Sequence, residues 1–372
     1  MQKGMIGAIV GLVIGVLLGV FVLAPSRMPS SVPMPSEPAP KAASMTEPAP
    51  EKVTWDMGSA YSGRLVQLGT LGVSLQSKIE KVSGGTLELK FYEPGALVPA
   101  LEMFDAVSAG SLDAAWSTPG YWFGKEKALT LFAAVPFGPA AGEYLGWFYY
   151  GGGKELMDEI YARHGIKSVL CGVIAPEASG WFREEIETVE DLKGLKMRFF
   201  GLGAKVMERL GVSTQLLAGG DVYPALERGS IDAAEFSMPA IDLALGFHQI
   251  AKHYYFPGWH QQSTLLDLMI NKAKWDALKP QHQAQIEMAC GDNIREGLAE
   301  GEAIQGKALK ELEAKGVEIH RWSPEILAAL EEAWNEVAAE LAAEDASFKK
   351  AWDSLQAFRA DYKVWSDLGY ID

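Results

Sequence analysis

The hexapeptides GSLDAA, at residues 110–115, and GSIDAA, at residues 229–234, are two copies of one sequence pattern. Each copy follows a segment with helical spacing of apolar residues, passes through a glycine turn and enters a short apolar run typical of a strand. A serine, Ser117 or Ser237, comes soon after each copy. The repetition predicts two similar lobes built from helices and strands, although chance recurrence of a common helix–turn–strand element would give the same pattern.

Strand-like and helix-like segments alternate outward from both copies, beginning near Val53. The expected strands are residues 53–57, 86–92, 113–116, 196–200, 214–217 and 232–236. The expected helices are residues 64–82, 97–109, 204–210 and 222–227. This alternation predicts an α/β fold with parallel sheets covered by helices. Because ligands bind beyond the carboxyl ends of strands in open α/β sheets, two facing lobes would form a binding cleft.

The C-terminal part of the chain is predicted to be mostly helical. Apolar positions recur at helical spacing over residues 281–314. Ser323 and Pro324 are typical of a helix start, with serine as the N-cap and proline in the first turn, and this helix should reach residue 343. A last helix is expected over residues 347–364. These helices would brace the two lobes or pack against another subunit.

The N-terminal residues 5–24 form an apolar run without charge, long enough at ~1.5 Å per residue to cross a bilayer. Because Pro25 would block cleavage after this run, we interpret it as an uncleaved anchor, with a cleaved signal peptide as the alternative. Its glycines, spaced every four residues, could pair two such helices or belong to an anchor without a partner. The proline-rich residues 25–52 are predicted to form an extended linker.

The charge balance and the motifs that are missing exclude several functional classes. The chain has 33 Lys+Arg and 48 Asp+Glu residues, a formal net charge of -15, which disfavours a nucleic-acid-binding protein. No histidine pair has metal-ligand spacing on a helix, and no Gly-x-Ser-x-Gly turn occurs. The GGGK run at 151–154 lacks the Ser or Thr of a phosphate-binding loop. No enzymatic motif is therefore present.

Cys171 and Cys290 are the only two cysteines in the sequence. A disulfide between them is allowed in an exported protein. Their wide separation in the sequence favours the interpretation that they are two buried thiols.

Three charged residues are candidates for a binding site. Arg198 ends an apolar strand in GLKMRFFG, and its guanidinium suits a carboxylate ligand or an acidic partner from the other lobe. Glu235 follows the apolar Asp232–Ala234 run, so it needs Arg198 or a cation as a partner. Glu177, taken alone, is typical of a solvated loop.

Aromatic residues gather around these candidates in the sequence. They are Trp116, Tyr121, Trp122, Trp181, Phe182, Phe236 and Trp259. Aromatic walls with a few polar groups are typical of a small-ligand pocket, but they are equally typical of a core.

Five motifs together resemble the solute-binding proteins of tripartite ATP-independent periplasmic (TRAP) transporters. They are AVPFG (134–138), GLKMR (194–198), AGGDVYPALERGSI (218–231), DAAE (232–235) and YYFPGW (254–259). The resemblance extends over residues 53–372 and is strongest to the subgroup that binds 2-oxo or 2-hydroxy monocarboxylates. The anchor-like run is a departure, because a cleaved signal is usual in that family.

The resemblance implies a two-lobed periplasmic-binding-protein fold that closes on its ligand. Lobe I would comprise residues 53–175 and 262–300, and lobe II residues 176–261 and 301–372. The protein would be periplasmic, held to the inner membrane by residues 5–24, and its partners would be TRAP permease subunits. The family also permits a homodimer through the C-terminal helices.

The resemblance assigns roles to individual residues. Arg198 stands where the family binds the ligand carboxylate. The subgroup holds a cation with a Gln side chain, a Glu carboxylate and the carbonyl of the next aromatic residue. Glu235 and Phe236 match the last two, with Phe in place of the usual Trp. Glu177 stands where the Gln is expected.

A charge count then predicts the cation. Glu177, Glu235 and a ligand carboxylate carry three negative charges, and Arg198 carries one positive charge. Ca²⁺ neutralises this set, whereas Na⁺, the alternative, leaves one buried negative charge.

The ligand's tail is expected to be a short apolar group. Trp116, Tyr121, Trp122 and Phe236 would limit its size. His260 would donate a hydrogen bond to the ligand or merely line the hinge. No second arginine lies near the motifs, which disfavours dicarboxylates.

The resulting hypothesis is a transport receptor that binds pyruvate-like or lactate-like acids and is not an enzyme. A membrane-tethered sensor of the same acids is the main alternative. A metal-dependent lyase or hydrolase using Glu177 and Glu235 is a third.

Overall fold

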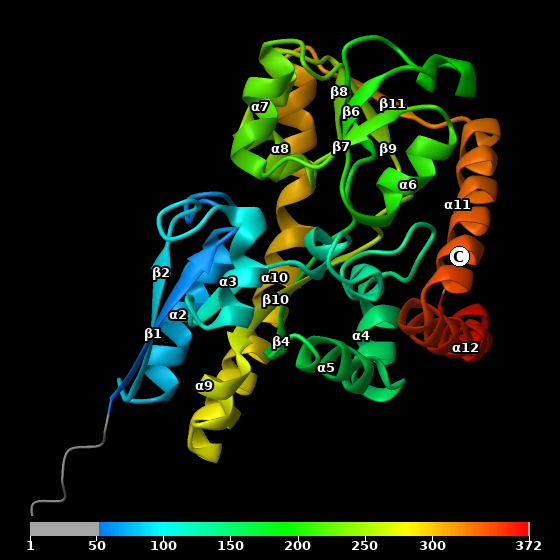
Figure 1. Cartoon of the computed structure of the whole chain (residues 1–372). Coiled ribbons are helices and arrows are strands. Elements are labelled where there is room, and N and C mark those ends of the chain that lie inside the picture. Colours follow the sequence, from blue (N-terminus) through cyan, green and yellow to red (C-terminus); the bar gives the residue numbers. More distant parts are fainter. Residues whose placement is uncertain (1–51, 371–372) are drawn as a thin grey trace, which may run out of the picture. The chain divides into compact units, whose positions relative to one another are not determined.

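The computed structural model describes residues 52–370, which contain two mixed β-sheets flanked by helices (Figure 1). The predicted anchor at residues 5–24 and linker residues 25–51 lie outside the described part of the chain. Among the helices of residues 52–370, none combines the length and the apolar character needed to cross a membrane.

The first sheet has the strand order β2–β1–β3–β10–β4. Its strands are β1 (Val53–Ser59), β2 (Leu87–Tyr92), β3 (Ala114–Ser117), β4 (Ile166–Ile174) and β10 (Thr264–Asn271). β1 pairs in parallel with β2 and with β3, whereas β10 pairs antiparallel with β3 and β4.

The second sheet has the strand order β11–β9–β5–β8–β6–β7. Its strands are β5 (Gly180–Phe182), β6 (Lys196–Arg198), β7 (Ser213–Gln215), β8 (Ala233–Ala234), β9 (His253–Phe256) and β11 (Glu318–Arg321). All of them run in one direction except β5, which is antiparallel to β8 and β9.

The prediction of parallel sheets is therefore wrong for one strand in each sheet. The reason lies in two chain segments that cross between the sheets: residues 166–182 carry β4 into β5, and residues 253–271 carry β9 into β10. These segments run antiparallel to each other in both sheets. Such a pair must contribute one reversed strand to each sheet, and these are β10 and β5.

Helices cover the two sheets and connect them. The α-helices are α2 (Thr70–Val82), α3 (Met103–Ala109), α4 (Ala141–Tyr150), α5 (Gly153–Ala162), α6 (Gly201–Arg209), α7 (Gly219–Glu227), α8 (Pro239–Leu245), α9 (Lys272–Asp276), α10 (Pro280–Ala314), α11 (Pro324–Glu344) and α12 (Ala346–Gly369). Short 3₁₀ helices are η1 (Ala100–Glu102), η2 (Pro119–Trp122), η3 (Lys127–Phe132), η4 (Val189–Leu192) and η5 (Phe247–Gln249). The predicted start of α11 is confirmed, since the Ser323 hydroxyl accepts a hydrogen bond from the Ile326 N–H at 3.2 Å.

The long helix α10 ties the two sheets together (gold in Figure 1). Its 35 residues contact β4 and α2 beside the first sheet and α8 beside the second. α11 packs on α6, and α12 packs on α4, α5 and η3. The lobe boundaries expected from the sequence remain a proposal. They assign α12 to lobe II, although its contacts with α4, α5 and η3 lie in lobe I.

The repeated GS(L/I)DAA pattern is a repeated structure. Gly110 and Gly229 end α3 and α7 with left-handed φ angles of 77° and 68°. The serine that follows each glycine donates a hydrogen bond to the carbonyl five residues earlier, at 3.1 Å in the first copy and 3.0 Å in the second. The left-handed position suits glycine because it has no Cβ, so both copies form the same helix–turn–strand structure.

The aspartate of each copy fixes the pairing of the strand that follows. Asp113 accepts a hydrogen bond from the Asp56 N–H at 2.7 Å, and Asp232 accepts one from the Lys196 N–H at 2.9 Å. Both donors belong to the neighbouring parallel strand, β1 or β6. The two copies therefore place β3 and β8 in the same way, with their carboxyl ends leading into Ser117 and Ser237.

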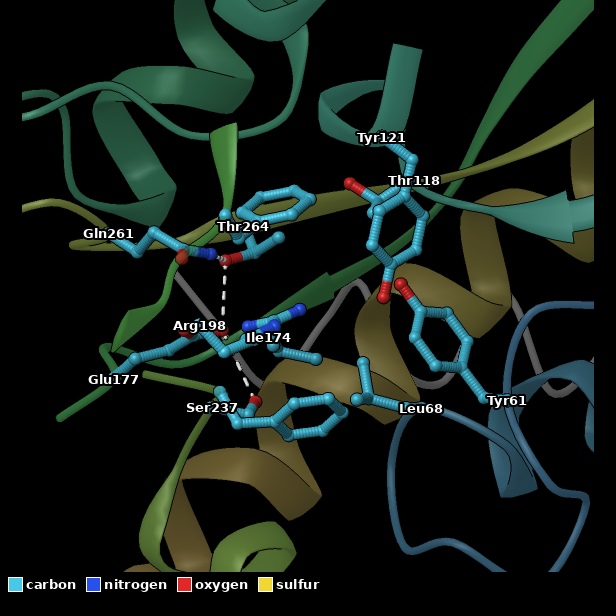
Figure 2. A pocket seen from close by; sticks show the side chains of 12 residues that line it. Tyr61, Leu68, Thr118, Tyr121, Ile174, Glu177, Arg198, Ser237, Gln261 and Thr264 are labelled. Carbon is cyan, nitrogen blue, oxygen red and sulfur yellow. Dashed lines mark hydrogen bonds between the residues drawn. The ribbon is translucent and has the colours of Figure 1, made fainter. Parts of the chain in front are cut away.

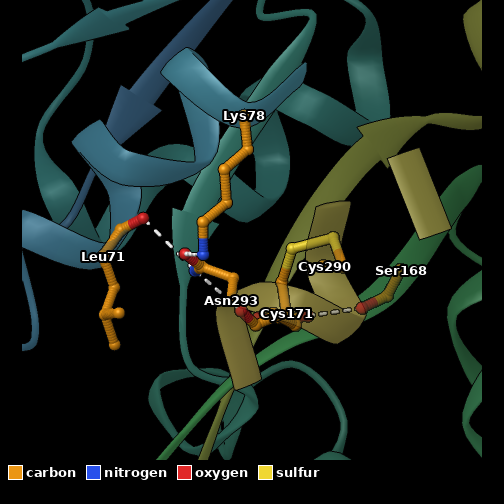
Figure 3. The surroundings of a disulfide bond; sticks show 7 residues. Leu71, Lys78, Ser168, Cys171, Cys290 and Asn293 are labelled. Atoms are coloured by element: carbon orange, nitrogen blue, oxygen red, sulfur yellow. Dashed lines mark hydrogen bonds between the residues drawn. A yellow bond between two sulfur atoms is a disulfide. The ribbon is translucent and has the colours of Figure 1, made fainter. Parts of the chain in front are cut away.

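Cys171 and Cys290 form a disulfide between β4 and α10, which corrects the prediction of two free thiols (Figure 3). Both residues are fully buried, as expected, and their Cα atoms lie 4.1 Å apart. The amide of Asn293, one turn further along α10, donates to the carbonyls of Cys171 and Leu71 at 2.9 and 3.2 Å. The pairing arises where α10 crosses β4, a contact between distant segments that spacing in the sequence does not reveal.

Removal of the disulfide should destabilise the fold. Because the bond closes a long loop in the unfolded chain, replacing Cys171 and Cys290 by Ala together is expected to lower the free energy of unfolding by about 2–5 kcal/mol. Urea unfolding without reductant would measure the loss. Reductant added during unfolding should bring the unmodified protein to the same value. Equal stabilities of the oxidised protein and the variant would contradict the bond.

Candidate functional site

A small cavity lies between the carboxyl ends of strands from both sheets (Figure 2). Its lining comes from the first sheet and its connections (Tyr61, Leu68, Thr118, Tyr121, Ile174), from the second (Arg198, Phe200, Phe236, Ser237) and from the crossing segments (Glu177, Gln261, Thr264). The cavity volume is about 20 Å³, close to that of one water-sized occupant. A larger ligand must therefore displace lining side chains.

A buried ion pair forms one wall of this cavity. Arg198, at the end of β6, donates through Nη1 to Oε2 of Glu235 at 2.9 Å and to the Glu235 carbonyl at 2.6 Å. Its Nε donates to the Leu217 carbonyl at 3.3 Å. Both side chains of the pair are almost completely buried. Within residues 52–370, Nη2 of Arg198 has no protein hydrogen-bond partner, so its two N–H groups, on one side of the guanidinium, remain available.

The partner of Arg198 resolves an alternative that the sequence left open. The alternative to a ligand carboxylate was an acidic residue of the other lobe that would pair with Arg198. The residue that pairs with Arg198 is Glu235, which follows the adjacent strand of the same sheet. The Phe236 ring lies 4.9 Å from the guanidinium carbon and shields it from solvent.

Glu177 is a third buried charged residue, which excludes its interpretation as a solvated loop carboxylate. Its Oε1 accepts hydrogen bonds from Thr264 at 3.1 Å and Ser237 at 3.2 Å, as Figure 2 shows. Gln261 donates in turn to the Thr264 hydroxyl at 2.6 Å. Oε2 of Glu177 has no hydrogen-bond partner among the described residues.

The turn after β9 holds the Glu177 backbone in place. The Gly258 N–H donates to the Glu177 carbonyl at 3.0 Å, and the Glu177 N–H donates to the Gln261 carbonyl at 3.2 Å. A Cβ on Gly258 would lie 2.2 Å from that same carbonyl oxygen. Glycine is therefore required where the two crossing segments touch.

The two glutamates have opposite pKa shifts. Burial, followed by the charges of Glu235 and Asp242, raises the pKa of Glu177 well above its usual value. Burial would also raise the pKa of Glu235, but Arg198, His260 and the Phe200 N–H outweigh it and hold that pKa below its usual value. The shifts thus favour the ionised form of Glu235 and the protonated form of Glu177.

Glu177, Glu235 and His260 form a group that fits a metal ion. One ligand atom from each residue lies within 4.8 Å of the others. Oε2 of Glu177 and Oε1 of Glu235 are buried without a hydrogen-bond partner, and Nε2 of His260 lies 3.4 Å from the latter. Buried carboxylate oxygens without partners are costly, and a hard cation such as Ca²⁺ or Na⁺ would satisfy them.

The structure brings together most of the predicted site residues. Glu177, Arg198, Tyr121 and Phe236 line the cavity, and Glu235 and His260 lie directly behind them.

Trp116 and Trp122, which were expected to limit the ligand's tail, do not line the cavity. Trp116 is buried behind Leu68, to whose carbonyl its indole N–H donates at 2.6 Å. Trp122 packs against Phe104, with ring centroids 5.5 Å apart. Both are core residues because the strand and helix that carry them turn these rings away from the cavity.

Sequence reasoning missed most of the polar lining. Ser237, Gln261 and Thr264 contact Glu177 directly or through one another, and none of them was a candidate. The serine after each GS(L/I)DAA copy was the one available signal, since Ser237 comes soon after its copy, as Ser117 does after the first. Gln261 and Thr264 become neighbours of Glu177 only through the crossing segments.

The comparison with known families gives a match over residues 59–345. The matching model is DctP, described as bacterial extracellular solute-binding protein, family 7.

Individual relatives agree with this match. A monocarboxylate 2-oxoacid-binding periplasmic protein of Nostoc sp. is 35% identical over 321 residues, which are 86% of this chain and 87% of the relative. A TRAP transporter solute-binding protein from Bordetella bronchiseptica is 34% identical with a TM-score of 0.84 over 86% of this chain and 95% of that one. It is a mixed-occupancy dimer with copurified calcium and picolinate in the bound site. A TRAP solute-binding protein from Pseudoalteromonas atlantica, with bound sodium and pyruvate, is 33% identical with a TM-score of 0.83 over 86% and 97% of the chains.

Stability without ligand or cation should fall as pH rises. The pKa of Glu177 is raised well above its usual value, that of Asp242 to about 7 and that of Asp267 to about 6, in each case mainly by burial. The folded state therefore holds more protons than the unfolded state between about pH 4 and pH 7. The contribution of each carboxyl group to the free energy of unfolding is fully present below the pKa that the group has in the unfolded state. It is lost as the pH rises through the pKa in the folded state, by about 1.4 kcal/mol per pH unit for each proton.

Urea unfolding with chelator at several pH values would measure this slope. The Asp242→Asn variant removes one of these groups, so its slope should be shallower. Stability that rises between pH 5 and pH 7 in the unmodified protein would contradict the prediction.

Proposed function

Since the chain belongs to the bacterial extracellular solute-binding proteins of family 7, the solute receptors of TRAP transporters, we propose that it binds a small 2-oxo or 2-hydroxy monocarboxylate together with a cation. Proteins of this family are transport receptors and not enzymes. The loaded receptor would deliver its ligand to the TRAP permease. The observation that carries the proposal is the pair of unpartnered oxygens, Glu177 Oε2 and Glu235 Oε1, beside the Arg198 guanidinium.

Arg198 would bind the ligand carboxylate. Its Nη2 is the donor left over after Nη1 and Nε are engaged by protein acceptors. Arg198 is also the only lysine or arginine that lines the cavity among the described residues. One guanidinium edge suits one carboxylate, which favours monocarboxylates over dicarboxylates.

The rest of the lining would select the shape of the ligand. Once a ligand displaces lining side chains, the apolar side chains of Leu68, Ile174, Phe200 and Phe236 would leave room for no more than a short alkyl tail. Pyruvate and lactate satisfy this limit. Their 2-oxygen would lie toward the cation, because Glu177 lines the cavity and the unpartnered oxygen of Glu235 lies behind the lining.

The cation is proposed to be Ca²⁺, with Na⁺ as the alternative. With His260 counted as neutral, Glu177, Glu235 and a bound carboxylate exceed Arg198 by two negative charges. A divalent ion neutralises this excess, whereas a monovalent ion leaves one buried charge. When bound, the ion would supply charge neutralisation and a ligand for the 2-oxygen. Glu177, Glu235 and the Phe236 carbonyl are the residues proposed to hold it.

Thermal unfolding of the purified protein should respond to ligand only when a cation is present. Pyruvate and lactate with Ca²⁺ are expected to raise the midpoint, because binding to the native state stabilises it by mass action. Succinate should have little effect. A chelator should remove most of the response, because the 2-oxygen of the ligand would lose the cation and its carboxylate would compete with Glu235 for Arg198.

The Glu177→Gln variant is the matched control for the choice of cation. It removes one negative charge at constant size, so Na⁺ should support pyruvate binding in this variant as well as Ca²⁺ does in the unmodified protein. An unchanged preference for Ca²⁺ would refute the role of Glu177, and the absence of any ligand response would refute the cavity assignment.

The C-terminal end of α12 is proposed to bind a second copy of the chain. Val364, Trp365, Leu368 and Tyr370 are 60–82% exposed, an unusual gathering of large apolar side chains on one helix end. The Bordetella relative is a dimer, which supports a second copy as the occupant.

Charge introduced into this surface should separate the copies. Trp365→Glu with Leu368→Glu is expected to convert the dimer to a monomer, as measured by light scattering after size-exclusion chromatography. Asp353→Asn, in the first half of α12, is the control that should leave the dimer intact. A monomeric unmodified protein would contradict the proposal.

A periplasmic location is proposed from the family, and anchoring by residues 5–24 remains a prediction because those residues lie outside the described chain. The alternative of a membrane-tethered sensor depends on the same residues 5–24 and also remains a prediction.

A further inference from the structure

We propose that the protein carries a second metal site, for Zn²⁺ or a similar transition-metal ion, formed by His253, Glu318 and His320. The three residues lie on β9 and β11, at the outer edge of the second sheet. None of them lines the cavity that contains Glu177 and Arg198.

The strand pairing brings the three side chains to one face. β9 and β11 are parallel neighbours, with His253 opposite Glu318 and Tyr255 opposite His320. Side chains two residues apart on a strand share a face, so Glu318 and His320 point the same way. The cluster lies at the amino end of β9, whereas the cavity lies beyond the carboxyl end of that strand.

The ligand atoms have distances close to those of a transition-metal centre. Nδ1 of His253 lies 3.1 Å from Nε2 of His320. Two nitrogens bound tetrahedrally at about 2.0–2.1 Å from Zn²⁺ lie about 3.3 Å apart. Oε2 of Glu318 lies 3.8 Å from the first nitrogen and 4.0 Å from the second, and its exposed side chain can close this gap.

Neighbouring residues orient His320 for binding. Its Nδ1 lies 3.5 Å from Oε1 of Glu185, so an N–H at Nδ1 would leave the Nε2 lone pair facing His253. Its ring stacks on Tyr255, with centroids 4.7 Å apart and planes at 14°. The Tyr255 hydroxyl is itself fixed by the Ile186 backbone, accepting from its N–H at 2.7 Å.

The ligand set selects the class of metal. Two imidazoles and one carboxylate are typical of Zn²⁺ and its neighbours in the transition series, whereas Ca²⁺ prefers oxygen ligands only. Glu318 and Glu185 provide two negative charges beside the two imidazoles. The site would hold the edge strand β11, and with it the connection between α10 and α11, to the rest of the sheet.

Zinc titration of the full chain without a histidine tag tests this proposal. After treatment with chelator, Zn²⁺ should raise the unfolding midpoint of the protein in the absence of pyruvate and Ca²⁺. His320→Ala should weaken Zn²⁺ binding at least 10-fold, and the exposed Glu318→Gln variant provides the same test if His320→Ala fails to fold. Glu185→Gln should weaken binding about 10–100-fold by loosening the orientation of His320.

Two controls separate this site from other sources of zinc binding. His248→Gln removes a histidine outside the cluster and should leave the affinity unchanged. Glu177→Gln alters the cavity and should also leave it unchanged, whatever its effect on pyruvate binding.

Several outcomes would overturn the proposal. They are the absence of a zinc-induced shift, loss of the shift in Glu177→Gln, and an unchanged affinity in a double His253→Ala and His320→Ala variant. Destabilisation of His320→Ala without any zinc binding by the unmodified protein would show that the two histidines form only a hydrogen-bonded pair.

Discussion

The buried ion pair between Arg198 and Glu235 is the constraint on which the cavity depends. A charged side chain without a partner would be strongly destabilising at this depth, so each residue requires the other. The pair can form because β6 and β8 are adjacent parallel strands that end at the same edge of the second sheet. The Phe200 N–H adds a hydrogen bond to Glu235 at 3.0 Å and fixes which carboxylate oxygen faces the arginine. Arg198 and Glu235 are therefore preorganised, and the remaining guanidinium edge and carboxylate oxygen have fixed directions.

The two crossing segments supply the other polar residues of the site. Glu177 lies on the segment that joins β4 to β5, and His260 and Gln261 lie on the one that joins β9 to β10. The two segments touch at Gly258, so the third carboxylate and the histidine arrive from the chain that links the sheets and not from the strand ends. A change in the relative position of the sheets would move these segments as well as α10. The geometry of Glu177 is therefore coupled to that change more directly than the geometry of Arg198.

Local sequence patterns predicted the parts of the fold that depend on local interactions. The GS(L/I)DAA repeat, the strand that ends at Arg198 and the Ser323–Pro324 helix start all have their signal within a few residues, and all are confirmed. The features that were predicted wrongly have no signal within a few residues of the sequence. The direction of β10, the Cys171–Cys290 bond and the burial of Trp116 and Trp122 in the core depend on contacts between distant segments. A buried aromatic residue beside a site and one in a core have the same local sequence, which is why only the structure distinguishes Tyr121 from Trp116.

The opposite pKa shifts of Glu177 and Glu235 link the binding of a cation to the binding of an anionic ligand. A protonated Glu177 has one donor and one acceptor, much like the glutamine that the family resemblance places there, and it adds no charge beside a ligand carboxylate. A cation that displaces this proton restores the charge of Glu177 and compensates for it in the same step. An anionic ligand entering without the cation would face Glu235, whose charge Arg198 already neutralises, and would compete for the same guanidinium. The cation and the anionic ligand therefore each lower the free-energy cost of binding the other. By linkage, the effect must be equal in both directions.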